Sequence, residues 1–458
     1  MEQIQYCRTL PVFDEVDILV VGAGPAGIGA AISAARSGAK TMLFDQNGYV
    51  GGQATAGRVG PFMTCYDAKN ENMIIRGIFK EIVERMKVLG GAIDPKEIQA
   101  EEPYSGFYKI GHAHVGPFEH ECFKQVSTDM LLEAGVTLLL HTFFVDVVME
   151  EKRISGVVVA NKSGMSVIRA KIVIDCSGDA DVAAKAGVPF ELGNTRDGNI
   201  QPATLFFRVG NVNTEELKAH IRAHADEIRP FYGPFSWLIR EKKEEWKIPR
   251  GEIGLFEGPE AGIYRINTTR ILNTNGTDVK SLTSAELEGL RQAHEVFDFL
   301  KKYAAGFEHA VFLDTADMVG IRESRHIKGK YWMTGEDVLA CRVPEDTNCG
   351  HGQQNMDTHN KDNPGGSFIT IQNGSYFGVP YRCLLPQGVE NLLVAGRCIS
   401  ADALAGSAIR MIPCCLAFGQ AAGTAATLSL KKHIDPVDVC VGELRECLEK
   451  QDVYLGGE

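Results

Sequence analysis

The hydrophobic pattern near the start of the chain changes its period twice between residues 17 and 45. The run DILVV is apolar and β-branched, which favours a buried strand, and it stops at a G-x-G-x-x-G that begins at Gly22. An Ala- and Ile-rich stretch from Pro25 to Gly38 predicts a helix with a glycine at its C-terminal end. KTMLF then predicts a second strand, which ends at Asp45. This order is typical of a dinucleotide-binding βαβ unit.

Each residue of the glycine turn has a physical role in such a unit. Gly22 allows the tight turn, Gly24 lets the backbone approach a pyrophosphate, and Gly27 lets helix and strand pack closely. The start of the helix offers free N–H groups and a positive dipole end to phosphates. Asp45 lies 18 residues after Gly27, where a carboxylate can accept hydrogen bonds from a ribose.

Two later segments repeat the mixture of strand, turn and helix. Residues 170–187 predict a strand that ends at an acid and then a short helix. Residues 390–430 predict a strand, a glycine turn, a loop and a long apolar helix, so the chain returns to the nucleotide-binding sheet. We therefore expect an α/β fold with a discontinuous Rossmann-like domain, residues 1–196 and 366–458, and an inserted substrate or cap domain, residues 197–365.

The inserted segment has a pattern of its own. Strands are predicted at residues 201–209, 254–258 and 262–272. Residues 283–307 predict a helix with Thr283 at the N-cap and Glu286 three residues later, which is a capping box. Strands followed by a helix indicate a mixed α+β domain laid over the nucleotide.

Composition narrows the class of protein. The 458 residues are 44% hydrophobic and 23% charged, as in a globular protein, and the net charge of −12 argues against nucleic acid as a partner. No stretch predicts a membrane span, and residues 1–17 lack the layout of a signal peptide, so we expect a cytoplasmic protein. None of the 12 cysteines forms C-x-x-C, which disfavours a dithiol redox pair.

The segment after Asp45 bears on which dinucleotide is bound. A Gly/Ala-rich loop with Gly51 and Gly52 follows, where an NAD dehydrogenase would pass into another βα unit. Such a loop suits close backbone contact with a long extended ligand. This loop counts against an NAD dehydrogenase. A second G-x-G-x-x-G is missing from the sequence, so a separate NAD(P)H-binding unit is not indicated.

Together with the opening motif, three stretches resemble the FAD-dependent oxidoreductase family. They are VIDCSGDAD (173–181), MVGIRESRHIKGKYWMTGEDV (318–338) and PYRCLLPQGVENLLVAGRCISADALAGSAIR (380–410). The resemblance covers more than half of the chain and implies the two-domain arrangement of glutathione-reductase-like and fumarate-reductase-like flavoproteins. The middle, residues 197–315, matches no particular substrate domain.

The resemblance implies one FAD, bound end to end across these motifs. The pyrophosphate would meet the glycine turn and the helix start at Pro25 and Ala26, and the adenosine ribose would meet Asp45 and Gln46. The remaining implied contacts are the adenine at Val145, the adenosine half at Ser177, Gly178 and Asp179, the ribityl side at Gly51, Gly52, Gln53, Gly396 and Arg397, and the flavin ring at a helix start near Gly406, Ser407 and Ala408.

Candidate catalytic groups come from two places. In IRESRHIKG, residues 321–329, His326 is the first candidate, because hydride exchange needs a proton to move and imidazole titrates near neutral pH. Arg325 is a candidate clamp for a carboxylate or for the flavin. The alternative is that this charged run pairs with Glu323, Glu336 and Asp337 and holds the domains together. Cys65 and Tyr66 are further candidates, as an acid and a hydroxyl donor, with core packing as the alternative.

Two polar segments are open to more than one interpretation. His112 and His114 would share one face of a strand, but a third ligand is not fixed, and His120 is only one option, so we expect no metal site. Residues 348–368 predict a long loop, which is either a lid or an ordinary surface loop.

The expected activity is that of a FAD-dependent oxidoreductase, which exchanges a hydride between flavin N5 and a small polar or anionic organic substrate. One alternative is a flavin reductase of an unsaturated substrate, fed by NAD(P)H or a carrier. The alternative from another class is a non-catalytic FAD-binding or sensor module. The sequence leaves open the electron donor or acceptor, and whether copies of the chain form a homo-oligomer.

Overall fold

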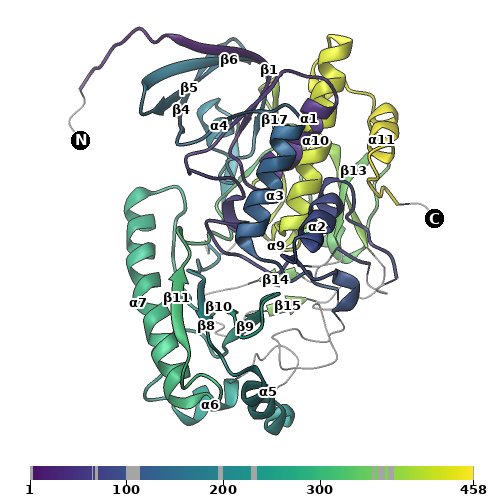
Figure 1. Ribbon diagram of the computed structural model, residues 1–458. Coiled ribbons are helices and arrows are strands. Elements are labelled where there is room, and N and C mark those ends of the chain that lie inside the picture. Colours follow the sequence, from purple (N-terminus) through teal and green to yellow (C-terminus); the bar gives the residue numbers. More distant parts are fainter. Residues whose placement is uncertain are drawn as a thin grey trace.

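The structure is a computed structural model of the chain, shown in Figure 1. It describes residues 4–63, 65–67, 71–98, 114–193, 200–227, 235–352, 356–358, 367–369 and 376–456.

A seven-stranded sheet forms the larger part of the fold. Its strand order is β3-β2-β1-β6-β5-β4, and β17 pairs with the C-terminal part of β6 on the edge opposite β1. The central strands run parallel, and β5 and β4 add an antiparallel edge. The bounds are β1 Val12–Val21, β2 Thr41–Phe44, β3 Thr137–Leu139, β4 Phe143–Glu150, β5 Arg153–Asn161, β6 Gly164–Asp175 and β17 Leu392–Val394. The expected α/β class and the return of the chain to this sheet near its end are confirmed.

Helices α1, Pro25–Arg36, and α10, Ile412–Lys432, pack against each other beside this sheet (Figure 1). Small residues allow the contact: a Cβ added at Gly419 or Gly423 would overlap the backbone of α1. Around the pair lie α2, Ile78–Val88, α3, His120–Glu133, and α11, Val441–Glu449. The interior of both helices is therefore buried, as their Ala-rich sequences require.

The predicted long helix near the end of the chain is divided. A short helix α9, Ala403–Ile409, comes first, and α10 follows at 94° to it. Asp402 caps α9 by accepting a hydrogen bond from Ala405 N at 2.8 Å. The helix start predicted near Gly406 is therefore wrong, because the Asp402 cap starts α9 earlier and Pro413 marks a second start at α10.

A second sheet lies within the predicted insertion. Its antiparallel order is β11-β8-β10-β9, with bounds β8 Phe207–Gly210, β9 Gly254–Glu257, β10 Tyr264–Asn267 and β11 Val311–Thr315. Phe207, Val209, Tyr264 and Ile266 form one core with Val296 and Leu300 of helix α7. Helices α5, Thr214–Ala223, and α6, Ser236–Glu241, complete this part, which is the lower half of Figure 1. The three predicted strands are present but shorter than predicted, and the domain limits at 196 and 365 stay a prediction.

Helix α7 runs from Val279 to Tyr303, so the predicted start at Thr283 is wrong. Asp278 is the N-cap, and its side chain accepts a hydrogen bond from Ser281 N at 2.8 Å. Thr283 instead donates to Val279 O inside the helix, and Glu286 accepts from Val319 N. The helix starts at the acid five residues earlier because aspartate is the stronger N-cap.

Short elements connect the two parts. Strand β7, Phe190–Leu192, pairs with β12, Arg325–Ile327, and β13, Thr347–Gly352, pairs with β16, Phe377–Pro380. A third pair joins β14, Met356–Thr358, to β15, Ser367–Ile369, and two further helices are α4, Asp181–Lys185, and α8, Gly335–Leu339. The prediction that residues 348–368 lack strands is thus wrong for the three strands, while residues 353–355 and 359–366 lie outside the described residues.

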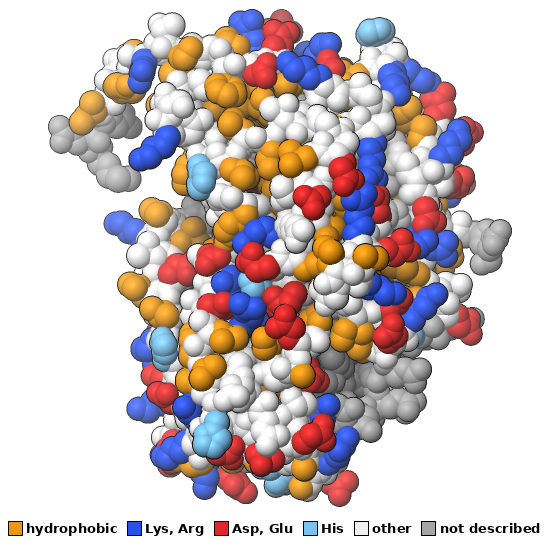
Figure 2. Space-filling view, in the orientation of Figure 1, with side chains coloured by type: hydrophobic (Ala, Val, Ile, Leu, Met, Phe, Trp, Pro, Cys, Tyr) orange, Lys and Arg blue, Asp and Glu red, His pale blue; other side chains and the backbone are white. Residues whose placement is uncertain are grey.

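One face of the surface is shown in Figure 2, where basic and acidic side chains are interspersed and hydrophobic ones form small groups. This face shows no extended area of one sign, which binding to a phosphate backbone would need. Among the described helices none alone is long and apolar enough to cross a bilayer, although α9 and α10 pass that test as a bent pair, by length and composition.

Candidate functional site

The turn between β1 and α1 has the geometry that a dinucleotide needs. Gly22 has φ of 96°, in the left-handed region that favours glycine. A Cβ at Gly27 would overlap the carbonyl oxygen of Gly22, so helix and strand approach as closely as predicted. Gly24 is different, because a Cβ there would meet no protein atom within 4 Å. It is also the N-cap of α1 and has no side-chain cap, which leaves the first N–H groups free for phosphate.

The second glycine loop lies directly against this turn. Gly51 has φ of 114° and donates its N–H to Ala23 O at 2.8 Å. A Cβ at Gly52 would be 2.8 Å from the Cα of Gly24. Gln53 follows in a short 3-10 helix, and in the part of the chain that the structure describes its buried Oε1 has no hydrogen-bond partner. The two glycine segments, separate in sequence, thus form one surface with a spare acceptor.

Asp45 ends the second strand beside the turn. Its Oδ2 accepts from Ala23 N at 2.7 Å, and Oδ1 accepts from Asn47 N at 2.8 Å. Burial raises the pKa of Asp45 against these hydrogen bonds. Asp45 therefore braces the turn. Oδ1 also accepts from Asn47 Nδ2 at 2.9 Å, so Oδ2 is the oxygen that keeps a lone pair for a ribose. Gln46 is exposed, while Thr142 N donates to Asp45 O and brings the start of β4, and hence the half-buried Val145, to this end of the sheet.

The residues after β6 meet the turn after β17. Asp175 accepts hydrogen bonds from the N–H of Ser177 at 3.0 Å and of Ala183 at 2.9 Å, and its burial raises its pKa to about 6. A Cβ at Gly178 would be 3.4 Å from Nη1 of Arg397, and Arg397 forms an ion pair with Asp179.

The turn after β17 in turn reaches the start of α1. A Cβ at Gly396 would be 3.4 Å from the Cβ of Ala26. Nε of Arg397 is buried and has no hydrogen-bond partner among the described residues. The predicted contacts for the adenosine, phosphate and ribityl parts of FAD are thus brought together from four chain segments, and unpartnered polar atoms point to a polar ligand between them.

Two helix N-termini, those of α9 and α10, are candidates for the helix start that the sequence predicted beside the flavin ring. Ser407 donates its hydroxyl to Leu404 O within α9, and Gly406 and Ala408 are buried inside the same helix. The α10 N-terminus at Met411 has no side-chain cap, and a Cβ at Gly29 of α1 would overlap the carbonyl of Leu416 one turn further on. The uncapped end of α10 is therefore the better source of positive helix dipole. Pro413, common in the first turn of helices, was the signal for it.

His326 lies on β12 against helix α9. A Cβ at Gly406 would be 2.8 Å from its Cε1, and Ile327 N donates to Cys398 O at 3.0 Å, beside the Gly396 turn. Nε2 of His326 is 3.4 Å from Oε1 of Glu323. The side chains of both residues are almost completely buried, and within the described part of the chain neither ring nitrogen nor that carboxylate oxygen has a hydrogen-bond partner.

Arg325 points to a different set of partners. It donates to the carbonyl of Asp179 at 2.9 Å and pairs with Asp181 at 2.8 Å. It also lies over the ring of Phe190. The charge therefore braces the loop after β6. The carboxylate that it pairs with is that of Asp181, which is not one of the three acids named for the pairing alternative.

Cys65 and Tyr66 lie in the hydrophobic core around α1 and α10. Burial raises the pKa of Cys65 well above its ordinary value, so the thiol stays protonated at neutral pH. Burial likewise raises the pKa of Tyr66 to about 12, and its ring stacks on His114 at 4.5 Å. His114 is a turn residue, so its predicted place in a strand is wrong, and His112 lies outside the described residues. The described residues hold no group of three or more metal-ligating side chains.

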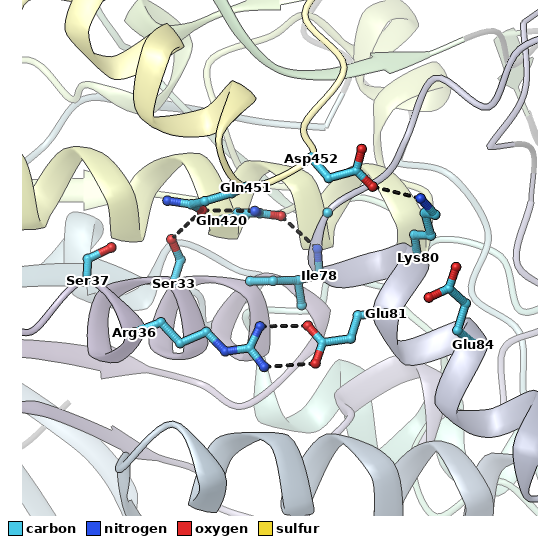
Figure 3. Close-up of a pocket in the computed structure, with 11 residues that line it drawn as sticks. Ser33, Arg36, Ser37, Ile78, Lys80, Glu81, Glu84, Gln420, Gln451 and Asp452 are labelled. Carbon is cyan, nitrogen blue, oxygen red and sulfur yellow. Dashed lines mark hydrogen bonds and ion pairs between the residues drawn. The ribbon is translucent and has the colours of Figure 1, made fainter.

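A cavity of about 320 Å³ lies away from the glycine turn, between α1, α2, α10 and the end of the described chain (Figure 3). Arg36 pairs with Glu81 along one side of it. Gln420 donates to Gln451 at 3.0 Å on the other. Because these side chains satisfy one another, we assign the cavity to packing and not to the cofactor.

Comparison with known proteins agrees with this site. The model of the family described as FAD dependent oxidoreductase matches residues 17–448. A thiamine thiazole synthase of Aeropyrum pernix is 32% identical over 143 residues, 31% of this chain and 43% of that protein. A digeranylgeranylglycerophospholipid reductase of Methanococcoides burtonii is 22% identical over 283 residues, 59% of this chain and 63% of that protein. This chain therefore covers less than two thirds of either relative.

A solved structure described as geranylgeranyl bacteriochlorophyll reductase-like, from Thermoplasma acidophilum, has a TM-score of 0.46, with 13% identity over 96% of this chain and 84% of that one. The family match alone spans nearly the whole chain, and it includes the glycine turn, the Asp45 strand and the returning helix α10. On that match, this chain belongs to the FAD dependent oxidoreductase family and is an enzyme that uses FAD.

Proposed function

We propose that this enzyme exchanges a hydride between FAD and a small polar or anionic organic substrate, and that His326 moves the accompanying proton. When bound, FAD supplies the hydride chemistry of its ring system. The residues that would hold it are the two glycine segments, Asp45, and the Gly396–Arg397 turn. Gly24, with open space at its Cβ position, and the unpartnered Nε of Arg397 fit a bound pyrophosphate and sugar chain.

The observation that best supports this proposal is that His326 is buried next to Glu323 and that its ring nitrogens lack hydrogen-bond partners among the described residues. Its side chain is 5% exposed, that of Glu323 is 2% exposed, and the two lie 3.4 Å apart. Buried polar groups are nearly always hydrogen-bonded, so an imidazole with two unpartnered nitrogens needs a functional reason. A proton donor or acceptor that completes its hydrogen bonds only with substrate present is such a reason.

Glu323 is the residue that would orient the imidazole. Its Oε2 accepts from Gln201 N at 3.1 Å, which fixes the carboxylate. The other oxygen then faces His326, in the manner in which a buried carboxylate sets the tautomer and orientation of a catalytic histidine. Gln201 is itself held, because its Oε1 accepts from Arg410 at 3.0 Å. The proton-transfer group thus rests on a connected polar network.

The other three candidates have contacts that favour supporting roles. Arg325 is engaged with Asp181, and the raised pKa of the Cys65 thiol makes it a poor acid at neutral pH. Tyr66 stacks on His114, and its hydroxyl keeps a proton at physiological pH. We keep Tyr66 as a possible hydrogen-bond donor and place the proton chemistry on His326.

A reductase of an unsaturated substrate is the second candidate. It is favoured by the similarity to a protein named as a reductase, digeranylgeranylglycerophospholipid reductase 1, over 59% of this chain. The same histidine would then deliver a proton and not remove one. The two directions differ in whether the substrate bleaches the flavin or restores its colour.

The test is substitution of His326 by glutamine, with rapid-mixing measurement of flavin reduction by a substrate found in a metabolite screen. We expect His326→Gln to keep FAD and to slow reduction about a hundredfold, the usual scale for loss of an acid–base group. His294→Gln, an exposed histidine on α7, is the control. A wild-type rate in His326→Gln, with an unchanged pH profile, would move the proton chemistry to another residue.

A further inference from the structure

The four-stranded sheet has two chemically different faces. Along β10 the side chains alternate, so Tyr264 and Ile266 lie in the core with α7, while Arg265 and Asn267 occupy the opposite face. Arg208 of β8 lies directly opposite Arg265 in the strand register. The face away from the helices is thus polar and cationic, although it is buried.

This polar face is turned toward the cofactor segments of the other domain. The guanidinium of Arg265 covers Gly60, because a Cβ at Gly60 would overlap its Nη1. Gly60 ends the second glycine segment, seven residues after Gln53. The two parts of the fold also come close at Gly320. A Cβ added there would be 3.3 Å from Oε1 of Gln53 and 3.0 Å from the carbonyl oxygen of Thr204. Arg265 therefore lies between the substrate sheet and the loop predicted to follow the ribityl chain.

Arg265 differs from its neighbours in lacking a carboxylate partner. Arg208 pairs with Asp314 at 2.6 Å, and Arg58 pairs with the same carboxylate at 2.8 Å. Arg265 is 4% exposed, donates to the carbonyl of Phe118 and stacks on the ring of that residue at 4.5 Å. Among the described residues no carboxylate forms an ion pair with it, and Glu119 is the nearest acid that offsets its charge.

Removing a guanidinium from water without an ion partner is costly. Burial lowers the pKa of Arg265 to about 10, which still leaves it charged at neutral pH. A buried cation that the protein does not pair is explained when an anion arrives from outside. Such an anion would complete the set of bonds that Phe118 leaves open.

Two more arginines join Arg265 on this face. Asn267 Oδ1 accepts from Arg250 at 3.4 Å and from Arg322 at 3.5 Å, both long hydrogen bonds. Arg250 pairs with Glu252 at 3.0 Å through Nη2. Its Nε is buried, and no described residue is hydrogen-bonded to it. Arg322 is held at its other end by Pro202 O and Thr204 Oγ1, each at 2.6 Å. These bonds aim both guanidinium groups at the same end of β10.

We propose that Arg265, with Arg250 and Arg322 around Asn267, forms the subsite for a carboxylate of the substrate, so that the substrate is an organic acid. This inference rests on the proposed function, because it specifies what the hydride-exchanging site binds. The planar guanidinium suits the two oxygens of a carboxylate, which an ammonium group or a neutral amide does not match. The carboxylate would be anchored on the polar face of β10 while the reacting carbon is directed toward the cofactor loop.

The test titrates the FAD-loaded enzyme with a fixed panel of carboxylates, namely succinate, fumarate, pyruvate and benzoate. The neutral controls are succinamide, fumaramide, pyruvamide and benzamide. Binding is measured by calorimetry and by the change in the flavin absorption bands. We expect at least one carboxylate to bind wild type and its amide not to bind. Arg265→Gln should weaken that carboxylate at least tenfold, and Arg265→Lys should weaken it less, because the charge remains and the planar fork is lost.

The control for substitution is Arg291→Gln, an exposed arginine on α7 that pairs with Glu288 and Glu295, and it should bind as wild type. If Arg265→Gln does not hold FAD, Arg250→Gln tests the same subsite and should also weaken the carboxylate. Binding of no panel carboxylate, or equal binding by wild type and variants, overturns the inference. So does a shifted flavin potential in Arg265→Gln without carboxylate binding, which would assign Arg265 to the flavin.

The two proposals fail in different ways. If a neutral metabolite reduces the flavin while no carboxylate binds, hydride exchange stands and the carboxylate subsite is wrong. If carboxylates bind through Arg265 but no compound exchanges electrons with the flavin, the subsite stands and the proposed function is wrong.

Discussion

Substitution of Gly24 by valine separates the ligand-binding role of the glycine turn from its folding role. Gly24 has φ of −70° and ψ of −176°, an extended conformation that any residue adopts. A Cβ there meets no protein atom within 4 Å, so the side chain of valine fits the folded chain without displacing it. The same side chain projects into the space over the α1 N-terminus, where the pyrophosphate is expected.

The expected loss of FAD affinity in Gly24→Val can be estimated from the crowding between the valine side chain and the pyrophosphate. Forcing extra methyl groups into a filled site costs about 1–3 kcal/mol. For a ligand this corresponds to a roughly 5- to 150-fold loss of FAD affinity. The stability of the FAD-free protein should change little, because the added atoms face open space in the protein.

Gly27→Ala is the matched comparison within the same turn. Here the added Cβ overlaps the backbone carbonyl of Gly22, which cannot move aside as a flexible side chain would. We expect the FAD-free protein itself to lose about 1–3 kcal/mol of unfolding free energy. The two glycines, three residues apart, should therefore fail in opposite ways.

The assay is a pair of measurements on each variant. Thermal unfolding of FAD-free protein reports folding, and titration with FAD followed by its fluorescence reports affinity. At the same FAD concentration, added FAD should raise the melting temperature of Gly24→Val less than that of wild type, because a ligand stabilises the folded state to an extent that grows with its affinity. A Gly24→Val protein with full FAD occupancy and wild-type affinity would refute the assignment of this turn.

Two further predictions concern stability. Burial alone would raise the pKa of Asp314, but hydrogen bonds from Arg208 and Arg58 outweigh it and lower that pKa to about 2. A carboxyl group whose pKa is lowered on folding stabilises the fold at pH values above its ordinary pKa near 3.8, and this stabilisation is lost as the pH falls toward 2. In urea unfolding, Asp314→Asn should therefore lower the unfolding free energy by about 1–2 kcal/mol near pH 7 and by progressively less below pH 4. A cost independent of pH would exclude these ion pairs as its source. Asp402→Ala removes the N-cap of α9 and should lower the unfolding free energy by about 1 kcal/mol in the same assay. Asp402→Asn keeps a capping oxygen and should recover most of that loss. Equal losses in both variants would assign the effect to the charge of Asp402.

The sequence correctly predicted the elements whose structure depends on residues adjacent in the chain. The DILVV strand, the turn at Gly22 and the helix from Pro25 are determined by residues next to one another, and all are present. The hairpin of β4 and β5 is likewise formed by residues close together in the sequence. The approach of Gly52 to Gly24 could be expected only through the family resemblance, because these glycines are 28 residues apart.

Helix starts were predicted less well because several good caps compete. Asp278 precedes Thr283, and both begin a plausible first turn, so the aspartate decided the start of α7. Between α9 and α10 the apolar composition is interrupted by Arg410 alone, and Pro413 marks the second start. Composition without attention to that proline predicted a single helix.

The cationic subsite could not be predicted from spacing alone. Arg265 and Asn267 alternate with Tyr264 and Ile266 in YRIN, which indicates one apolar and one polar face. What the alternation cannot show is that the polar face is buried against Gly60, more than 200 residues earlier in the chain. Only the tertiary structure distinguishes a buried arginine from a solvated one.

The central claim is that FAD in this protein exchanges electrons with a small substrate of its own. The most direct test is the absorption spectrum of the purified enzyme under anaerobic conditions, first with NADH or NADPH and then with a panel of organic acids and neutral metabolites. The account predicts flavin bands that stay oxidised with either nicotinamide and bleach with a member of the panel. Bleaching by NADH or NADPH would make the enzyme a nicotinamide-fed reductase, and a flavin that no donor reduces would contradict the claim altogether.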